Sequence, residues 1–597
     1  MSRIITFAAS LVLLQSRSNA QFTGNNQTNI ISGVASNWAG TYYVGSNYLF
    51  DALLIQNGGT LTSGAAFIGS NAGANSNAAI VSGNGSVWDS SPFLYIGNNG
   101  AGNLLVIGGG GAVVDNTSYL GYGAVSSSNN SALVSGNGSV WTNRGSLYIG
   151  YIGAENNLVV SNGGVVVCGD AGYVGYAFSS TSNRVLVTGI GSIWNNHSAL
   201  TVGYTGAGNR LTIDNGGAVI NDSGAITLNM GNSNSVLVTG AGSVWTNNVS
   251  LTVGTRGVGS SLVVSNGGQV VIVGTGGLST LSSVGGNFAD ANNNSVLVTG
   301  SGSFLSSRPN FGVGVRGTNN ALTITNEGAF AGGNVYIGLT SGADNNRMDV
   351  ANGSLFSTNT TADATLDIRR GTLNLDSGTV TADRLLLTNG TASVIAFNGG
   401  SLNSKGTVVT NTQQFVVGNS VASANFHLLG GVHSFNNGLR IRTNSFLTGC
   451  GTVNGSIIID PGGGAHTTCT NLVFTGNVTN NGAMVVDGAG LETFGTFVNN
   501  GKIYLLNGGT TNLHGSFINN GQILNGDIHL AIERDGSGGF FVRYTGAPDV
   551  TYRLQRATSV TGPWSDLVTN IAPASGFIEY HEATPLLGEA FYRTVQP

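Results

Sequence analysis

The chain has 597 residues, of which 41% are hydrophobic, 8% are charged and 96 are glycine, and its formal net charge is −5. Disordered chains combine few apolar residues with high net charge, so this composition indicates a folded chain despite its glycine content. Nucleic-acid binding needs clustered Lys and Arg, and the scattered cations found here argue against such a partner.

The first twenty residues have the features of a targeting sequence. A positive start at Met1-Ser2-Arg3 precedes an apolar run at Ile4–Leu14, and Ala20 ends a short polar segment. This layout predicts a secretory signal peptide over residues 1–20, cleaved after Ala20; the alternative is a buried N-terminal helix. The mature chain is then expected to be secreted or held at the cell surface, outside the cell or on the periplasmic side of the outer membrane. No other stretch is apolar enough to predict a transmembrane segment.

A repeated phrase, Gly-Ser-(Val/Ile)-Trp, organises the next part of the chain. Its aromatic position occurs at Trp88, Trp141, Trp194 and Trp245, in steps of 53, 53 and 51 residues. A period this regular indicates a repeat architecture, which also suits a chain too long for one compact core.

Each of these units divides into two similar halves that begin with asparagine. This leading residue occurs in steps of 25 to 27, is replaced once by Ser260, and resumes after an insertion; it is found at Asn77, Asn103, Asn130, Asn156, Asn183, Asn209, Asn234, Asn294, Asn320 and Asn346. Short alternating Val/Ile/Leu/Thr strands at this period predict one coil of a β-solenoid per half, over residues 21–365. An isolated coil cannot bury its apolar side, so coils must stack, and stacking predicts ladders of asparagine side-chain amides.

Two further repeated features have a structural interpretation. The pairs Gly163-Gly164, Gly216-Gly217 and Gly267-Gly268 predict corners that need positive φ. The tryptophan in every second coil is interpreted as core or corner packing. The alternative is an exposed row of aromatic rings that binds sugars.

The Leu-x-Val-x-Asn-Gly-Gly and Gly-Ser-x-Trp phrases resemble the repeats associated with type V secretion and PEP-CTERM proteins. The resemblance covers roughly residues 50–360. It implies a right-handed parallel β-helix of the kind found in autotransporter passengers and other exported proteins of Gram-negative bacteria. It implies no catalytic residue, because the motif of that family contains none.

From residue 366 to 526 the coils become shorter. Asn-Asn-Gly phrases begin at Asn480, Asn499 and Asn519, in steps of 19 and 20, and this region resembles the autotransporter-associated β-strand region. Cys450 and Cys469 lie one such coil apart, and stacked strands about 4.8 Å apart bring two cysteines within disulfide range. We therefore predict a Cys450–Cys469 disulfide; the alternative is two buried free thiols. Cys168 is expected to be a lone core thiol.

The composition changes again over residues 527–597, where charges and prolines become more frequent and the repeats stop. Three alternating segments separated by turns predict a small β-sandwich. The phrases Tyr552-Arg553-Leu554-Gln555-Arg556 and Gly562-Pro563-Trp564 resemble fibronectin-type-III-like modules of exported bacterial proteins. We expect this module to cap the open end of the solenoid, which otherwise presents unpaired strand edges.

The sequence assigns no catalytic, cofactor-binding or metal-binding residue. The cysteines and histidines show no metal-ligand spacing. The best acidic group contains Asp344, Asp349, Asp367, Asp376 and Asp383, with Arg369, Arg370 and Arg384 nearby in sequence. General acid–base cleavage of a polysaccharide needs two carboxylates about 5–10 Å apart, and spacing alone does not establish such a pair.

The most economical hypothesis is a non-enzymatic exported protein, an adhesin or a structural scaffold. Its long face of Asn, Ser, Thr and Gly suits many weak contacts with polysaccharide or other cell-surface components. Two alternatives remain open at this point: a polysaccharide-active β-helix enzyme, lyase or hydrolase, and a carbohydrate-binding module that uses the tryptophans.

Overall fold

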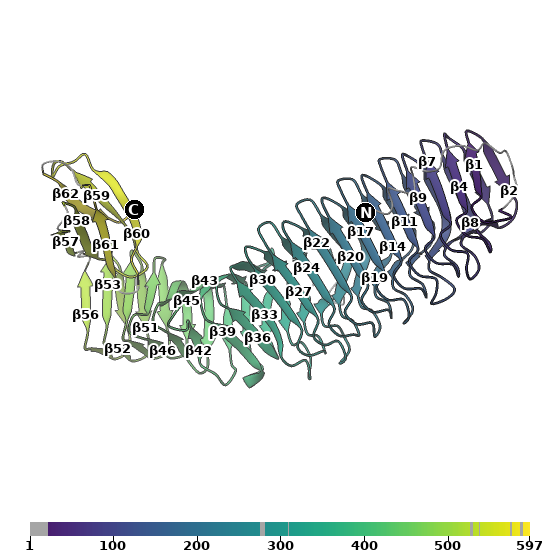
Figure 1. The fold of residues 1–597 in the computed structure, drawn as a ribbon. Helices are drawn as coiled ribbons and strands as arrows, with labels where there is room; N and C mark the ends of the chain where they lie inside the picture. The colour runs from purple at the N-terminus through teal and green to yellow at the C-terminus, as the bar shows by residue number, and fades with distance from the viewer. Residues whose placement is uncertain are drawn as a thin grey trace. The chain divides into compact units, whose positions relative to one another are not determined.

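The computed structural model describes residues 22–274, 281–308, 310–525, 529–535, 538–573, 576–584 and 589–597. These residues are nearly all β, with 54% strand and 1% helix, and their parallel sheets stack as a β-solenoid of about 18 turns (Figure 1). The predicted all-β solenoid is therefore confirmed. The predicted signal peptide, residues 1–20, lies outside the described residues. In the described part of the chain, no helix has the length and apolarity needed to span a membrane.

The chain divides into two units, residues 1–323 with 327–330, and residues 324–326 with 331–597. In the first unit each turn of the solenoid has three faces. Face 1 is built from β1 (Thr28–Ser32), β4 (Ala52–Gln56), β7 (Ala78–Ser82), β9 (Leu104–Gly108), β11 (Ser131–Ser135), β14 (Asn157–Ser161), β17 (Arg184–Thr188), β20 (Arg210–Asp214), β22 (Ser235–Thr239), β24 (Ser261–Ser265) and β27 (Ser295–Thr299).

Faces 2 and 3 share four long strands that bend from one face to the other: β8 (Val87–Ile96), β10 (Ala112–Leu120), β21 (Ala218–Ile226) and β23 (Val244–Val253). Face 2 also contains β2 (Ala35–Trp38), β5 (Thr60–Ser63), β12 (Val140–Asn143), β15 (Val165–Cys168), β18 (Ile193–Asn196), β25 (Gln269–Ile272) and β28 (Phe304–Ser307). Face 3 also contains β3 (Tyr42–Val44), β6 (Ala66–Ile68), β13 (Leu147–Ile149), β16 (Gly172–Val174), β19 (Ala199–Val202), β26 (Ser282–Val284) and β29 (Phe311–Val313).

Strand pairing on face 1 is parallel and places equivalent residues of successive turns beside one another. Arg184 of β17 pairs with Arg210 of β20, and Val185 pairs with Leu211. Because side chains alternate along a strand, Val185 and Leu211 are buried whereas both arginines are exposed. The predicted alternation of inward and outward side chains therefore determines which residues form the core.

The four repeated tryptophans form part of one inward column on face 2. In this column Trp88, Trp141, Trp194 and Trp245 alternate with a smaller residue, such as Val113 between the first two. All four indoles have 0% exposure. A large residue in one turn and a small one in the next fill the interior without overpacking. This alternation explains why the sequence period is two coils rather than one.

The predicted asparagine ladder is present. From Asn103 to Asn234, each leading asparagine accepts two hydrogen bonds on its Oδ1, from the backbone N–H and the Nδ2 of the asparagine one turn earlier. At Asn156 these bonds come from Asn130, with donor–acceptor distances of 3.0 and 3.1 Å. The same pair of bonds joins Asn77 to Asn103, Asn103 to Asn130, Asn156 to Asn183, Asn183 to Asn209 and Asn209 to Asn234. Buried polar groups are thereby satisfied along the axis.

The two glycines of each corner pair are needed for different reasons, which the sequence did not reveal. The first glycine has positive φ, +83° at Gly163 and +86° at Gly216, as predicted. The second glycine, Gly164 or Gly217, does not have positive φ. A Cβ at Gly164 would lie 2.4 Å from the backbone oxygen of Val134, one turn earlier. The prediction of positive φ is therefore wrong for the second glycine, which is needed because two turns approach closely there.

The second unit contains parallel strands with shorter steps, and its described helix is one 3₁₀ turn, η1 (Gly390–Ala392). Its first strands are β32 (Val335–Ile337), β33 (Asn346–Ala351), β34 (Gly353–Ser357), β35 (Thr365–Ile368), β36 (Gly371–Leu375), β37 (Gly378–Ala382), β38 (Arg384–Leu387), β39 (Ser393–Phe397), β40 (Gly400–Ser404), β41 (Thr407–Val409), β42 (Phe415–Val417), β43 (Ala424–Phe435), β44 (Leu439–Ile441) and β45 (Ser445–Asn454). β30 (Ala321–Thr325) and β31 (Ala329–Gly332) contain the boundary between the units.

The later turns of this unit are built from β46 (Ile457–Ile459), β47 (Gly464–Thr467), β48 (Asn471–Phe474), β49 (Val478–Asn480), β50 (Ala483–Asp487), β51 (Gly490–Thr493), β52 (Phe497–Asn499), β53 (Lys502–Leu506), β54 (Thr510–Leu513), β55 (Phe517–Asn519) and β56 (Gln522–Asn525). Asn480 pairs with Asn499, which pairs with Asn519, in the predicted steps of 19 and 20. Their side chains form a second amide ladder, with Nδ2 to Oδ1 distances of 2.8 and 2.7 Å.

The C-terminal module consists of two antiparallel three-stranded sheets. One has the order β57-β58-β61 and the other β60-β59-β62. Their bounds are β57 (His529–Arg534), β58 (Phe540–Thr545), β59 (Thr551–Ala557), β60 (Ser565–Ile571), β61 (Phe577–Glu582) and β62 (Phe591–Val595).

The core of this module is shared with the solenoid. Tyr544, Tyr552 and Leu554 of the module belong to the same buried cluster as Val485 of β50 and Leu506 of β53. Side chains of the following strands β55 and β56 remain largely exposed. The module therefore contacts β50 and β53, which precede the last strands of the solenoid. That it caps the open end of the solenoid stays a prediction.

A buried carboxylate should make the stability of the first unit depend on pH. Asp115 has 0% exposure, and its Oδ2 accepts a 2.9 Å hydrogen bond from Nε1 of Trp141. Burial raises the pKa of Asp115 from 3.8 to about 7. A raised folded-state pKa means that the fold favours the protonated carboxyl. The stabilisation is complete below pH 3.8 and is lost as the pH rises towards 7.

We therefore expect the free energy of unfolding of the wild type, relative to Asp115→Asn, to fall by about 1 kcal/mol per pH unit between pH 4.5 and 6.5. Urea unfolding of both proteins across this range measures the difference. The asparagine variant keeps an acceptor for Trp141 and removes the titration. Parallel pH profiles for the two proteins would contradict the prediction.

Candidate functional site

The outer surface of face 3 carries a double column of aromatic side chains, here called the aromatic ladder. It consists of Tyr43, Phe67, Tyr95, Tyr119, Tyr122, Tyr148, Tyr151, Tyr173, Tyr176 and Tyr204. All ten side chains are half-buried. The four repeated tryptophans, by contrast, are inside the solenoid and present no platform to a ligand.

The first column follows the middle, outward-facing position of the face 3 strands. Register pairs Tyr119 of β10 with Tyr148 of β13, and Tyr148 with Tyr173 of β16. Their ring centroids are 5.0 and 4.8 Å apart, and both interplanar angles are 8°. Tyr43, Phe67 and Tyr95 continue the column at 5.3, 4.6 and 5.1 Å. The column ends after Tyr173, because Thr201 takes the next position.

The second column stands in the turns that follow these strands. Tyr122, Tyr151, Tyr176 and Tyr204 stack at 5.0, 4.9 and 4.8 Å. Rings of the two columns meet almost at right angles, as in Tyr148–Tyr176 with an interplanar angle of 87° and Tyr173–Tyr176 with 86°.

These two sets of angles fix how the rings tilt. Both columns run along the solenoid axis. Because the ring planes of one column are nearly perpendicular to those of the other, the rings of the two columns cannot all be perpendicular to the axis. Stacked carbons need a plane separation of about 3.5 Å, and centroids spaced by 4.8–5.0 Å then require each column to tilt by roughly 45°, in opposite senses. The rings are therefore offset, and each leaves part of one face uncovered by its neighbour in the same column.

Five phenol groups of the ladder have a raised pKa and stay protonated at neutral pH. Burial raises the pKa of Tyr119 to about 12, with a further contribution from neighbouring tyrosines. Burial raises the pKa of Tyr95, Tyr148, Tyr173 and Tyr176 as well. The ladder therefore offers uncharged hydroxyl groups, which both donate and accept hydrogen bonds, beside apolar ring surface.

The sequence contains a signal for this ladder that our sequence reasoning missed. The phrase Tyr-x-Gly-Tyr occurs at Tyr119–Tyr122, Tyr148–Tyr151 and Tyr173–Tyr176. Its first tyrosine lies on a strand and its second in the turn, so each phrase adds one ring to each column. The steps between phrases, 29 and 25 residues, are less regular than those of the leading asparagines.

The structure joins Cys450 and Cys469 in a disulfide with a Cα–Cα distance of 5.8 Å. Cys450 lies in β45 and Cys469 follows β47, so the bridge connects successive turns. Cys168 is a free, fully buried thiol. Burial raises its pKa to about 12, which keeps it protonated.

The five aspartates that the sequence grouped as a possible acidic site each have a basic or amide partner. Asp349, Asp367 and Asp383 pair with Arg347, Arg369 and Lys405 at 2.9, 2.7 and 2.7 Å, and Asp344 lies 3.8 Å from Arg370. Asp376 accepts a 2.7 Å hydrogen bond from Asn398 Nδ2. Each of these carboxylates thus has a charged or amide partner of its own. Among the described residues, no group of three or more His, Cys, Asp or Glu side chains could hold a metal ion.

Comparison with known proteins adds no family to this picture. No protein-family model matches the sequence, and no curated protein matches it significantly.

Proposed function

We propose that this protein is an exported, non-enzymatic surface or extracellular scaffold that binds polysaccharide through the aromatic ladder of face 3. The observation that carries the proposal is the ladder itself, ten half-buried aromatic side chains in two stacked columns on the outside of the solenoid. An adhesive or structural role at a cell surface fits a repetitive outer face better than a single deep pocket.

The chemistry of the ladder suits neutral sugar rings. Aromatic side chains provide large, rigid apolar surfaces, and tyrosine adds a hydroxyl at one end. A sugar presents C–H groups on one face and hydroxyls around its edge, so it can use both parts of a tyrosine. Equivalent rings recur about every 5 Å along the axis, which allows successive sugars of an extended chain to make equivalent contacts.

The proposal includes export from the cytoplasm and a relation to autotransporter-passenger-like proteins. A signal peptide over residues 1–20 would deliver the chain from the cytoplasm, and a solenoid of about 18 turns is the architecture expected of an autotransporter-passenger-like protein with the repeats described above. The fibronectin-III-like reading of the C-terminal module belongs to the same proposal, and its two antiparallel three-stranded sheets support it.

The test replaces three neighbouring rings of the ladder. We expect the triple variant Tyr148→Leu, Tyr151→Leu, Tyr173→Leu to bind neutral polysaccharides at least tenfold more weakly than the wild type, because three aromatic contacts are lost. Affinity electrophoresis with soluble glucans, xylans and mannans, together with pull-down on insoluble cellulose and chitin, measures the change. Leucine keeps an apolar side chain on the outer face.

The matched control is Phe178→Leu, which removes an aromatic side chain that is 82% exposed and lies outside the ladder. It should bind as the wild type does. Circular dichroism and urea unfolding check that the triple variant stays folded. Retention of neutral polysaccharide by the folded triple variant, or failure of the wild type to bind any member of the panel, would overturn the proposal.

A further inference from the structure

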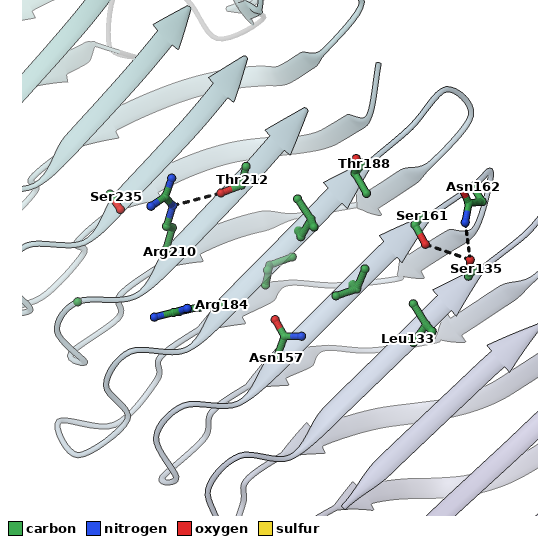
Figure 2. A pocket seen from close by; sticks show the side chains of 14 residues that line it. Leu133, Ser135, Asn157, Ser161, Asn162, Arg184, Thr188, Arg210, Thr212 and Ser235 are labelled. Carbon is green, nitrogen blue, oxygen red and sulfur yellow. Dashed lines mark hydrogen bonds between the residues drawn. The ribbon is translucent and has the colours of Figure 1, made fainter. Parts of the chain in front are cut away.

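Face 1 carries a second candidate surface, an open hollow of about 1040 Å³ on its outer side. The aliphatic side chains of Leu133, Val159 and Leu186, which occupy the middle outward position of successive strands, line it. Figure 2 shows Asn157, Arg184, Arg210 and Ser235 along one side of these strands, with Ser135, Ser161 and Thr188 along the other. The hollow thus combines an apolar centre with hydroxyl, amide and guanidinium groups at its margins.

Two arginines on adjacent strands are its distinctive feature. Arg184 and Arg210 are direct partners in the parallel register of β17 and β20, and both are exposed. Each follows a ladder asparagine, Asn183 or Asn209, whose amide contacts hold the start of the strand in place. Like charges on directly opposed positions of a sheet repel one another, so an anion bound between the two guanidinium groups would relieve this repulsion.

The surrounding carboxylates do not neutralise this pair. In the part of the chain that the structure describes, neither arginine forms an ion pair. Asp214 lies four residues further along β20, about 13 Å away, and accepts a hydrogen bond from Asn215 Nδ2 at 3.2 Å. Glu155 is exposed in the turn before β14. Arg210 Nε donates to Thr212 Oγ1 at 3.2 Å, which leaves its two terminal NH₂ groups for a ligand.

We propose that this hollow binds an anionic polysaccharide. Arg184 and Arg210 bridge its carboxylate or sulfate groups, while sugar rings lie over Leu133, Val159 and Leu186. Guanidinium groups form paired, charge-assisted hydrogen bonds with such planar or tetrahedral anions. The serine, threonine and asparagine side chains at the margins are suited to sugar hydroxyls.

A polysaccharide fits this place better than an acidic peptide. Peptides commonly bind sheets by adding a strand at an unpaired edge. The strands around the hollow are interior strands of a parallel sheet, because β14, β17 and β20 each pair on both sides. The backbone there is already paired, so recognition has to come from side chains. This inference rests on the proposed function for the ligand class, but it uses a different face and different residues.

The experiment compares the wild type with the double variant Arg184→Ser, Arg210→Ser. Serine already occupies the equivalent position of this column in β11 and β22, at Ser131 and Ser235, so the substitution fits the sheet. Binding is measured by isothermal titration calorimetry with polygalacturonate and alginate as carboxylated probes, heparin as a sulfated probe and a neutral glucan. We expect the double variant to lose at least tenfold in affinity for one anionic class or both and to keep the wild-type response to the neutral glucan. The carboxylated and sulfated probes distinguish the two sources of negative charge.

The matched control is Arg144→Ser, Arg316→Ser, which removes the same charge from two exposed arginines outside the hollow. It should bind anionic probes as the wild type does. Three outcomes would overturn the inference: no binding of any anionic probe by the wild type, unchanged binding by the double variant, or an equal loss in the control. The triple tyrosine variant of face 3 separates the two proposals, because it should lose neutral binding and keep anionic binding.

Discussion

Replacing Trp141 with alanine should lower the free energy of unfolding by about 5 kcal/mol, at the upper end of the cost of truncating a buried aromatic. The indole has 0% exposure and lies in register between Val113 and Val166, so its removal leaves a cavity that two small neighbours cannot fill. It also removes the Nε1 donor from Asp115, whose carboxyl is buried. Urea unfolding followed by far-ultraviolet circular dichroism measures the loss.

The effect should also be local, because each turn of a solenoid contacts only its neighbours. Hydrogen exchange is expected to lose protection first in β12, which contains Trp141, and in the paired strands β10 and β15. Trp38→Ala is the matched control, since Trp38 is half-buried and its Nε1 donates to a backbone oxygen close by. If both alanine variants lose the same stability, the inward tryptophan column does not have the packing role described here.

Replacing Asn156 with alanine should cost about 3–4 kcal/mol, because several buried hydrogen bonds are lost together. The backbone N–H and Nδ2 of Asn130 lose their shared acceptor. The Nδ2 bonds from Asn156 to Gly153 and Asn183 are lost as well. Alanine cannot accept a hydrogen bond and leaves too little room for water to restore all of them. Urea unfolding again measures the loss, as a shift of the midpoint concentration with an unchanged dependence of the free energy of unfolding on urea.

Asn195→Ala provides the comparison for this variant. Asn195 belongs to the same solenoid but points outward, and its Nδ2 lies 3.3 Å from Nε2 of His197. Its loss should cost less than about 0.5 kcal/mol, as for most surface substitutions. A similar small cost for Asn156→Ala would show that the amide ladder contributes little to stability.

Much of the fold follows from features that the sequence displays directly. The steps of 25–27 residues between leading asparagines give the length of one turn, and alternation within each strand separates Val185 and Leu211 from their outward neighbours. The asparagine ladder follows as well, since residues in equivalent positions must stack. The 19-residue separation of Cys450 and Cys469 similarly equals one short turn, and the two are bridged.

One exception in the ladder shows why the structure is needed to understand the pattern. Where Ser260 replaces asparagine, the residue facing it is Thr227 with φ +62°, whereas other turns have glycine there. At Gly203 a Cβ would lie 2.1 Å from Asn234 Nδ2, so asparagine in one turn requires glycine in the turn before. The shorter Ser260 leaves room for Thr227, and their hydroxyls are 2.5 Å apart. The two changes compensate for one another although they are 33 residues apart.

The sequence by itself determined the period, the strand alternation, the stacked asparagines and the short-turn region, because each is a local pattern repeated at nearly constant spacing. The tertiary structure alone decided which outward side chains meet. Turns of unequal length separate Tyr95, Tyr119, Tyr148 and Tyr173 by 24, 29 and 25 residues, yet strand pairing brings their rings to about 5 Å. Hydrogen-bonded register, rather than sequence distance, sets the neighbours of an exposed residue. For the same reason the Tyr-x-Gly-Tyr phrase signals the aromatic ladder without showing which rings stack. The Arg184–Arg210 pair and the contact of the C-terminal module with β50 and β53 emerge only from the folded chain.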